Sequence, residues 1–444
     1  MEDEVKASLN RLKQDNIEFL QVQFTDIAGA VKSLTLPKNR FESALTEGVV
    51  FDGSSVAGYA QIEESDMRAH LDQATYTILP ESAGGYRVAR YICDVYTPDG
   101  ERFPGDPRYA LQRILEKLQK KNMDFFVGPE FEFFVFKRDS NGNPTAIPSD
   151  YGGYFDNTPI DAANEIRQEI LKHLYDLGYH PEAAHHEVAY GQHEMDLRYG
   201  QALVMADRVA MLKSIIKNVA QKHGMYATFM PKPINGVNGS GMHVHQSIMS
   251  AGEKENLFYD AKAKYGMSEL GMHYMGGILK NINQASAVLA SWVNSYKRLI
   301  PGYEAPVYIS WANKNRSALI RVPAGNGMRK RMELRCPDSA GNPYLQFAVI
   351  LGMGLDGIDH KITPPDPVEK DIFHMSAAER EKNGIQSMPE SLGEALHHFR
   401  NSKLMREVLG DHIFENFITV KQREWDAFRS YVTKWELDRY LPIL

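Results

Sequence analysis

Cysteine is scarce in this chain: only Cys93 and Cys336 occur among its 444 residues. Neither lies in a Cys-x-x-Cys motif, so a thiolate metal site is not expected. Two reduced thiols in a cytoplasmic protein are the simplest interpretation.

Long apolar runs and blocks of positive charge are scarce as well. The N-terminal residues are charged and lack the apolar region of a signal peptide. The longest apolar stretch, near YLQFAVILGMGL, is too short to span a bilayer. The net charge is −7, and the one basic block is residues 329–331. We therefore expect neither a membrane nor a nucleic acid as the main partner.

The common nucleotide-binding motifs are absent or incomplete. No GxxxxGK[ST] segment occurs, so any use of ATP does not depend on a P-loop. Gly352, Gly354 and Gly357 match GxGxxG, but the chain soon reaches Pro364 and Pro365. A dinucleotide site needs a strand before the glycines and a helix after them. We interpret this segment as the end of an apolar helix.

Length and composition predict at least two domains. The chain is longer than the size at which a single core stops growing, and its 43% hydrophobic and 24% charged residues are ordinary for a globular protein. The stretch 97–107 is dense in Pro and Gly and indicates a linker. We expect a small N-terminal domain over residues 1–103 and a large domain over residues 104–444.

Hydrophobic patterning predicts an α+β fold. Strands are expected near residues 17–24, 31–36, 76–79, 86–95 and 125–136, with a long loop containing FDGSS between the second and the third. Helices are expected near residues 2–14, 161–177, 203–223 and 268–290, from Pro107 with Asp106 as its cap, and over most of the chain after residue 377. Strands and helices do not alternate strictly, which favours α+β over a doubly wound sheet.

Polar pairs spaced two residues apart are the most informative feature. The pairs are Glu130 with Glu132, His243 with His245, and Glu333 with Arg335. In a β-strand, residues i and i+2 project from the same face. Three strands are therefore able to direct two functional groups each into one space.

Five carboxylates in one space create a charge problem. Glu187 and Glu194 in HHEVAYGQHEMD join the three glutamates of the pairs. Two unit charges ~4 Å apart repel by roughly 4 kcal/mol at an effective dielectric of ~20. Two divalent cations would nearly balance the charge, since minus five plus four leaves minus one. Oxygen ligands with one imidazole suit Mg²⁺ or Mn²⁺ better than Zn²⁺.

Other segments suggest groups that bind anions. Four arginines lie among apolar residues: Arg298, Arg316, Arg321 and Arg335. Arginine offers planar donors to carboxylates and phosphoryl oxygens, although surface arginines serve solubility alone. The glycines of residues 236–241 let backbone N–H groups approach an anion, although Gly-rich hairpins have the same sequence. Glu304 lies in a Pro- and Gly-rich loop that could act as a lid.

Taken together, these segments resemble the type I glutamine synthetase family over nearly the whole chain. The resemblance rests on FDGSS, GPEFEFF, HHEVAYGQHE, NGSGMHVHQS, NSYKRLIPGYEAP, NRSALIRVP and MELRCPD, in that order. The length matches the shorter, non-adenylylated subgroup. The resemblance implies a β-grasp-like N-terminal domain, and a catalytic domain with an antiparallel sheet and helices. It also implies ligation of ammonia to L-glutamate with ATP through γ-glutamyl phosphate, in nitrogen assimilation.

The same resemblance implies a role for each motif residue. Two or more Mg²⁺ or Mn²⁺ ions would be held, one by Glu132, Glu187 and Glu194 and one by Glu130, His243 and Glu333. The glutamate site would include Arg298, Asn238 and Gly239, and the phosphoryl group would meet Arg316, Arg321 and Arg335. Nucleotide contacts would come from Glu182, His245, Ser247 and Arg321. Asp52 of a neighbouring subunit would deprotonate ammonium, and Glu304 would close over the site.

The resemblance also implies an assembly: a dodecamer of two hexameric rings with shared active sites. Small regulatory proteins are left open as partners. Phe373 stands where one subgroup carries an adenylylated tyrosine, and Gln61 where some relatives carry an arginine that mediates glutamine feedback. Neither form of control is therefore implied. Two alternatives remain open at this point, namely a ligase that joins glutamate to a polyamine or other amine, and a non-catalytic scaffold or regulatory relative.

Overall fold

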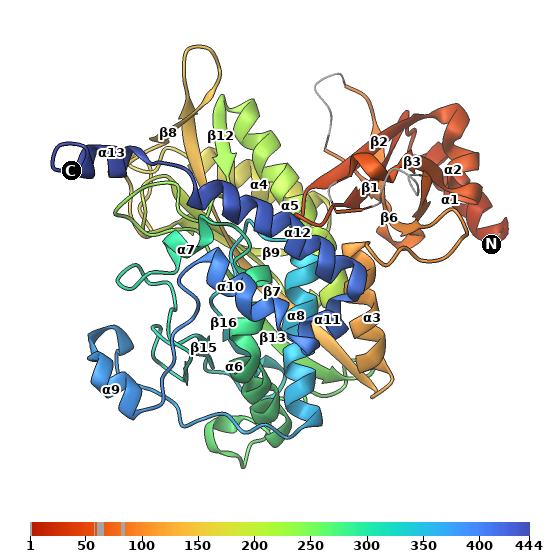
Figure 1. Cartoon of the computed structure of the whole chain (residues 1–444). Helices are drawn as coiled ribbons and strands as arrows, with labels where there is room; N and C mark the ends of the chain where they lie inside the picture. Colours follow the sequence, from red (N-terminus) through yellow and green to blue (C-terminus); the bar gives the residue numbers. More distant parts are fainter. Residues whose placement is uncertain (1, 57, 60–65, 81–84) are drawn as a thin grey trace.

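The computed structural model describes residues 2–56, 58–59, 66–80 and 85–444, so Gln61 lies outside the described residues. It consists of a small N-terminal unit and a much larger second unit (Figure 1). The expected α+β class is confirmed. Among the described residues, no helix is both long enough and apolar enough to cross a membrane.

The N-terminal unit is a six-stranded sheet with two helices. The strands run in the order β2-β1-β6-β4-β3, and β5 pairs with β6. Their bounds are β1 Phe19–Thr25, β2 Val31–Pro37, β3 Val49–Asp52, β4 Asp66–Leu71, β5 Thr77–Ile78 and β6 Val88–Tyr96, and the helices are α1 Glu2–Gln14 and α2 Phe41–Glu47. Strands β1 and β6 are parallel, and the other pairings are antiparallel.

The prediction of one long loop between residues 36 and 76 was wrong, because helix α2 and strands β3 and β4 occupy part of it. Buried Met67 and Ala69 alternate with Asp66, Arg68 and His70 along β4. The alternation typical of a strand is present, but Asp and Ala have low strand propensity, and tertiary pairing outweighs that preference.

The large unit is built around a ten-stranded sheet in the order β14-β15-β16-β13-β7-β10-β9. Its long central strand β7 (Met123–Arg138) also pairs with β8, β11 and β12. The other strands are β8 Pro144–Pro148, β9 Pro181–His186, β10 Gln192–Leu197, β11 Gly200–Gln201, β12 Met225–Thr228, β13 Met242–Ser250, β14 Trp311–Ala312, β15 Ile320–Arg321 and β16 Met332–Leu334. The pairing is antiparallel as expected, except that β14 and β15 are parallel.

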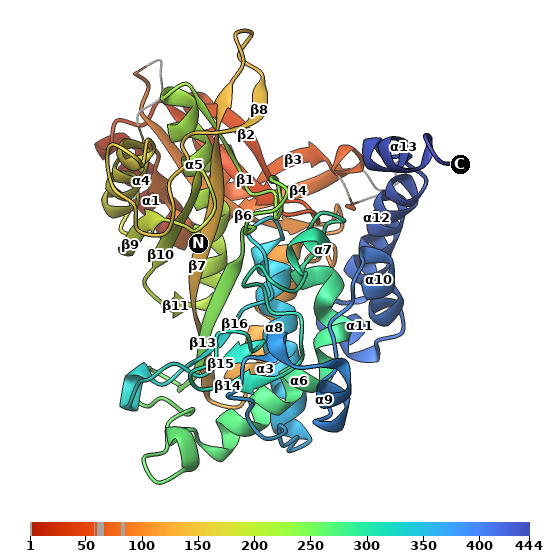
Figure 2. The same ribbon diagram turned by 90° about the vertical axis from the view of Figure 1, so that its left-hand side faces the viewer.

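Helices cover this sheet and extend to the C-terminus (Figure 2). Their bounds are α3 Pro107–Gln119, α4 Asn164–Asp176, α5 Ala202–Lys222, α6 Glu269–Leu289, α7 Ser295–Arg298, α8 Pro343–Asp359, α9 Ala377–Lys382, α10 Leu392–Arg400, α11 Lys403–Leu409, α12 Asp411–Arg429 and α13 Lys434–Tyr440. Helix α8 is almost entirely buried and packs on α3, α5 and α6. The glycines of the GxGxxG match lie inside α8, so the interpretation as part of an apolar helix is confirmed.

Candidate active site

Strand β7 carries Glu130 and Glu132 in the centre of the sheet and is buried on both faces. Its register places Glu130 opposite His243 of β13 and opposite Asp196 of β10. Glu132 lies opposite Glu194 of β10. Neighbouring strands lie about 4.8 Å apart, so cross-strand pairing brings these acidic and imidazole groups together from distant parts of the chain.

One cluster gathers Glu130, His243 and Glu333, whose ligand atoms all lie within 4.8 Å of one another. The His243 Nδ1 atom is 3.1 Å from Glu130 Oε2 and 3.5 Å from Glu333 Oε1. Arg335 Nε donates to Glu333 Oε1 over 3.2 Å, and Arg321 Nε donates to Glu333 Oε2. Burial alone would raise the pKa of Glu130, but hydrogen bonds from His243 and His245 hold it well below its usual range.

A second cluster gathers His185, Glu187 and Glu194, again within 4.8 Å. His185 Nε2 lies 3.1 Å from Glu194 Oε1. Glu132 faces this cluster across the sheet, and its Oε2 accepts hydrogen bonds from Gln192 Nε2 at 2.8 Å and from the Gly241 amide at 2.9 Å. The family resemblance implies that Glu132 shares a metal ion with Glu187 and Glu194, and by distance His185 also lies close to these two glutamates.

The two glutamates of the second cluster have raised pKa values. Burial, followed by the charge of Glu132, raises the pKa of Glu187 to about 8 and that of Glu194 to about 10. Burial and the nearby Glu130 raise the pKa of Asp196 to about 6. At neutral pH, Glu187 and Glu194 therefore need either protons or cations. The donor set, rich in carboxylate oxygen with imidazole, therefore fits a hard divalent cation.

We expect metal ions to stabilise the protein more strongly at high pH. Because the native pKa values of Glu187 and Glu194 are raised, their stabilising contribution is complete below the ordinary value of 4.5 and is lost as the pH rises through 8 and 10. A cation at 100 times its dissociation constant contributes about 2.7 kcal/mol per site. Thermal unfolding with and without Mg²⁺ at pH 6 and pH 9 measures this, and equal metal-induced shifts at both would contradict it.

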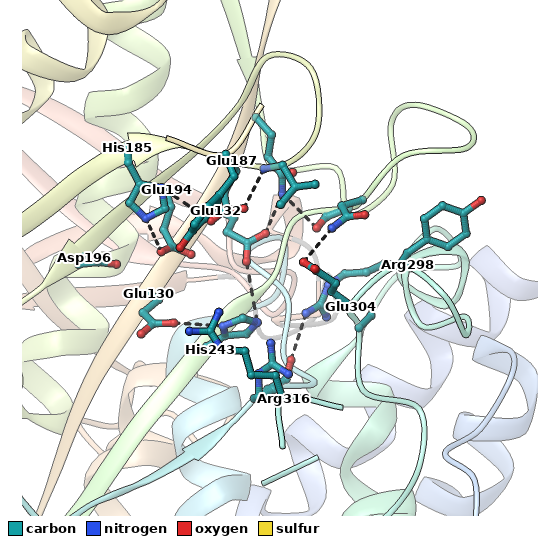
Figure 3. A pocket seen from close by; sticks show the side chains of 18 of the residues that line it. Glu130, Glu132, His185, Glu187, Glu194, Asp196, His243, Arg298, Glu304 and Arg316 are labelled. Atoms are coloured by element: carbon teal, nitrogen blue, oxygen red, sulfur yellow. Dashed lines mark hydrogen bonds and ion pairs between the residues drawn. The ribbon is translucent and has the colours of Figure 1, made fainter. Parts of the chain in front are cut away.

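Two neighbouring cavities open around the clusters. The first, with a volume of 770 Å³, is lined by both clusters and by Asn238, Gly239, Arg298, Glu304, Arg316, Arg321 and Arg335. The second, with a volume of 430 Å³, is lined by Glu182, His245, Ser247 and the basic segment 329–331. Glu130 and Asp196 line both cavities and so stand between them. Figure 3 shows the carboxylates facing Arg298, Glu304 and Arg316.

The structure thus brings together the candidate residues with one exception, Asp52, which lines neither cavity. Its carboxylate is exposed at the end of β3 and accepts hydrogen bonds from Ser54 and Ser55. The Ser54 side chain is the main cause that holds the pKa of Asp52 below its usual value. Arg321, expected at the nucleotide, lines the first cavity and not the second.

The residues of the first cavity that the sequence motifs did not select include His185, Gln192 and Asp196. Gln192, Glu194 and Asp196 alternate along β10, which is the same two-residue spacing that marked the other strands. The two-residue spacing therefore marks Gln192 and Asp196 as well as Glu194, although only Glu194 was predicted to belong to the site. The approach of His185 to Glu194 Oε1 depends on the pairing of β9 with β10.

The acidic clusters suit divalent metals and the arginines beside them suit anionic groups, so the site is that of a metal-dependent enzyme with anionic substrates. Family models described as the β-grasp domain and the catalytic domain of glutamine synthetase match residues 16–98 and 104–440. The chain is 49% identical to a glutamine synthetase of Methanosarcina mazei, covering 98% of this chain and 97% of that protein. It is also 49% identical to one of Thermus thermophilus, covering 98% of each.

A solved structure, "GmaS/ADP complex-Conformation 1", superimposes with a TM-score of 0.88 at 31% identity, covering 98% of this chain and 99% of that chain. The chain belongs to the glutamine synthetase family. It is a ligase that makes glutamine from glutamate and ammonium with ATP and a divalent metal. The amine-ligase and scaffold alternatives are not favoured.

Proposed function

We propose that the two clusters on either side of β7 hold two Mg²⁺ or Mn²⁺ ions with separate tasks. Glu132, Glu187 and Glu194 hold the ion that serves glutamate and ammonia, with His185 as an additional neighbour of that site. Glu130, His243 and Glu333 hold the ion that serves the ATP phosphates. The position of Glu130 between the two cavities is the observation that carries this proposal. Bound cations would offset carboxylate charge and polarise phosphoryl oxygens.

The remaining residues bind and orient the substrates. Arg298 grips the substrate carboxylate together with Asn238 and Gly239, while Arg316 and Arg335 stabilise charge on the phosphoryl group. Phosphoryl transfer depends mainly on positioning and charge stabilisation, which buried arginines supply. Arg335 is 7% exposed and donates to Glu333, so its guanidinium is held in one place.

On the nucleotide side, Glu182, His245, Ser247 and Arg321 contact ATP. The first three line the second cavity beside the basic segment 329–331. Arg331 Nε donates to His245 Nδ1 over 3.2 Å, which orients that imidazole. Arg321 reaches the phosphates from the first cavity, where it is paired with the metal ligand Glu333.

Ammonia must be deprotonated and the acyl phosphate must be protected from water. Ammonium is not nucleophilic until a base takes its proton, and we assign that base to Asp52 of a neighbouring subunit. Glu304 closes over the first cavity as a lid, and its Oε2 accepts a hydrogen bond from Asn238 Nδ2 at 3.1 Å. Exclusion of water favours attack by ammonia over hydrolysis.

The same proposal requires an oligomer, because Asp52 acts in the site of a neighbouring subunit, and we propose a cytoplasmic dodecamer of two hexameric rings. The C-terminal segment carries apolar side chains that the single chain leaves uncovered and projects away from the body (Figure 1). Trp435 is 63% exposed, Leu441 77% and Ile443 71%. Apolar surface of this kind is typical of protein–protein contact. In the proposed oligomer, another copy of the chain covers this surface.

Glutamine formation with ammonium, compared with ADP release on a panel of primary amines, tests the activity directly. Ammonium is expected to give the fastest turnover, with a requirement for Mg²⁺ or Mn²⁺. Faster turnover with an amine than with ammonium would show that the enzyme is an amine ligase instead. Absence of metal-dependent ADP release would overturn the proposed function.

The Arg298→Lys variant is expected to raise the KM for glutamate about tenfold to a hundredfold, the range for loss of charge-assisted hydrogen bonds. The KM for ATP should stay nearly unchanged. The guanidinium also donates to the carbonyls of Cys336 and Pro337, at 2.9 and 3.2 Å, so thermal stability should fall as well. Arg331→Lys, in the second cavity, is the crossed control and should affect ATP instead. Equal effects on both substrates in either variant would contradict the assignment.

A further inference from the structure

Lys232 is a buried lysine whose backbone is fixed on both sides. It lies between Pro231 and Pro233 and is 8% exposed. Its amide donates to Asn294 Oδ1 at 2.7 Å, and Asn294 Nδ2 donates back to its carbonyl at 3.1 Å. Proline restricts its own backbone and that of the residue before it. The start of the Lys232 side chain is therefore held next to α7, the helix that ends with Arg298.

The far end of this side chain joins two loops. The Lys232 ammonium donates to the carbonyl of Val237 and lies 3.7 Å from the centre of the Tyr303 ring. A cation at this distance from an aromatic face is attracted to it, most strongly where water is excluded. Lys232 thus links the loop of residues 236–241 to the lid, which we define as residues 301–305.

The two residues held by Lys232 directly precede the two residues that meet over the first cavity. Val237 precedes Asn238 and Tyr303 precedes Glu304, and Asn238 Nδ2 donates to Glu304 Oε2 at 3.1 Å. Glu304 has a φ of 58°, a left-handed conformation that costs a non-glycine residue energy. Such a conformation persists when neighbouring contacts enforce it, and the Tyr303 ring contact is one residue away.

Charge balance also sets Lys232 apart. Among the residues that the structure describes, no carboxylate lies within ion-pair distance of its ammonium. Burial, followed by the charge of Arg298, lowers the pKa of Lys232. A buried cation without an anionic partner is costly. If this side chain served only to pack between the loops, a neutral residue of the same length would do so without the cost of burying a charge. The charge therefore points to the contacts that the ammonium makes with Val237 and Tyr303.

We propose that Lys232 is a positioning residue that holds the lid and the 236–241 loop together, so that γ-glutamyl phosphate is kept from water. The proposal rests on the lid role of Glu304 given above. When the lid is displaced, water adds to the acyl carbon and phosphate leaves, which regenerates glutamate. Each such event consumes one ATP without forming glutamine, so Lys232 sets how tightly ATP use is coupled to synthesis.

The test is the ratio of ADP released to glutamine formed at saturating ammonium. The native enzyme should give a ratio near one, and Lys232→Met should raise it about threefold to tenfold, the range for loss of a partly desolvated cation–π contact. Lys232→Arg keeps the charge and should restore most of the coupling. Lys217→Met is the matched control, because its ammonium lies 5.4 Å from the Phe229 ring and contacts neither loop; its ratio should stay near one.

Tyr303 supplies an independent check if Lys232→Met does not fold. Tyr303→Leu removes the aromatic face and should raise the ratio, whereas Tyr303→Phe keeps the face and should not. An unchanged ratio in Lys232→Met or in Tyr303→Leu, with only turnover or stability lowered, would overturn the proposal. A native enzyme that forms no glutamine would instead overturn the proposed function, so the two failures are distinguishable.

Discussion

The Glu194→Gln variant is expected to lose at least ~10³-fold in kcat/KM, because loss of about 4 kcal/mol of metal-dependent stabilisation corresponds to that factor. Glutamine has the shape of a protonated glutamate, and burial together with the charge of Glu132 raises the pKa of Glu194 to about 10. The substitution should therefore leave the metal-free fold intact and remove one site for a cation.

Activity and thermal unfolding of the same samples separate these effects. The metal-free unfolding temperature should match that of the native protein, while the rise on adding Mg²⁺ should shrink. Glu116→Gln, an exposed carboxylate on α3, is the control and should behave as native in both assays. If Glu194→Gln kept native activity, or lost it only by unfolding, its assignment as a metal ligand would be wrong.

Mixing two inactive variants is expected to restore activity. An Asp52→Ala subunit lacks the base, and an Arg335→Ala subunit lacks the group that meets the phosphoryl oxygens. If Asp52 acts in the site of a neighbour, a site that contains both native residues can form between the two kinds of subunit. With random 1:1 mixing each native residue is present in half of the positions, so about a quarter of the native activity should return.

Each variant alone and a mixture of Arg298→Lys with Arg335→Ala are the controls. Arg298 and Arg335 line the same cavity of one chain, so that mixture can form only sites containing one altered arginine. It should give no more activity than the average of its two components. If Asp52→Ala with Arg335→Ala gave no gain either, Asp52 would not complete a neighbouring site.

The parts of the site that could be predicted are those marked by residues close together in the sequence. Strand alternation placed Glu130 with Glu132 and His243 with His245, and the structure puts both pairs on adjacent central strands. Caps were local as well: Asp106 Oδ1 accepts from the Arg108 amide at 3.0 Å, as the Asp-Pro start of that helix predicted.

The contacts that could not be predicted from the sequence join residues that are far apart along the chain. The approach of His185 to Glu194 follows from the register of β10 with β9. Likewise, the cation–π contact of Lys232 with Tyr303 joins loops about 70 residues apart, and no local pattern marks it. Strand β4 was missed because pairing within the sheet, rather than strand propensity, holds it extended. Strand β3 was missed although its residues Val49, Val50 and Phe51 favour a strand, because it has only four residues.

The central claim is that alternate carboxylates of one strand serve two different metal ions. Equilibrium binding of Mn²⁺ to the native protein and to Glu130→Gln and Glu132→Gln tests it most directly. We predict two tightly bound ions per native chain and one in each variant. The remaining ion should respond to glutamate in Glu130→Gln and to ATP in Glu132→Gln. One ion in the native protein, or loss of both ions in either variant, would contradict the account.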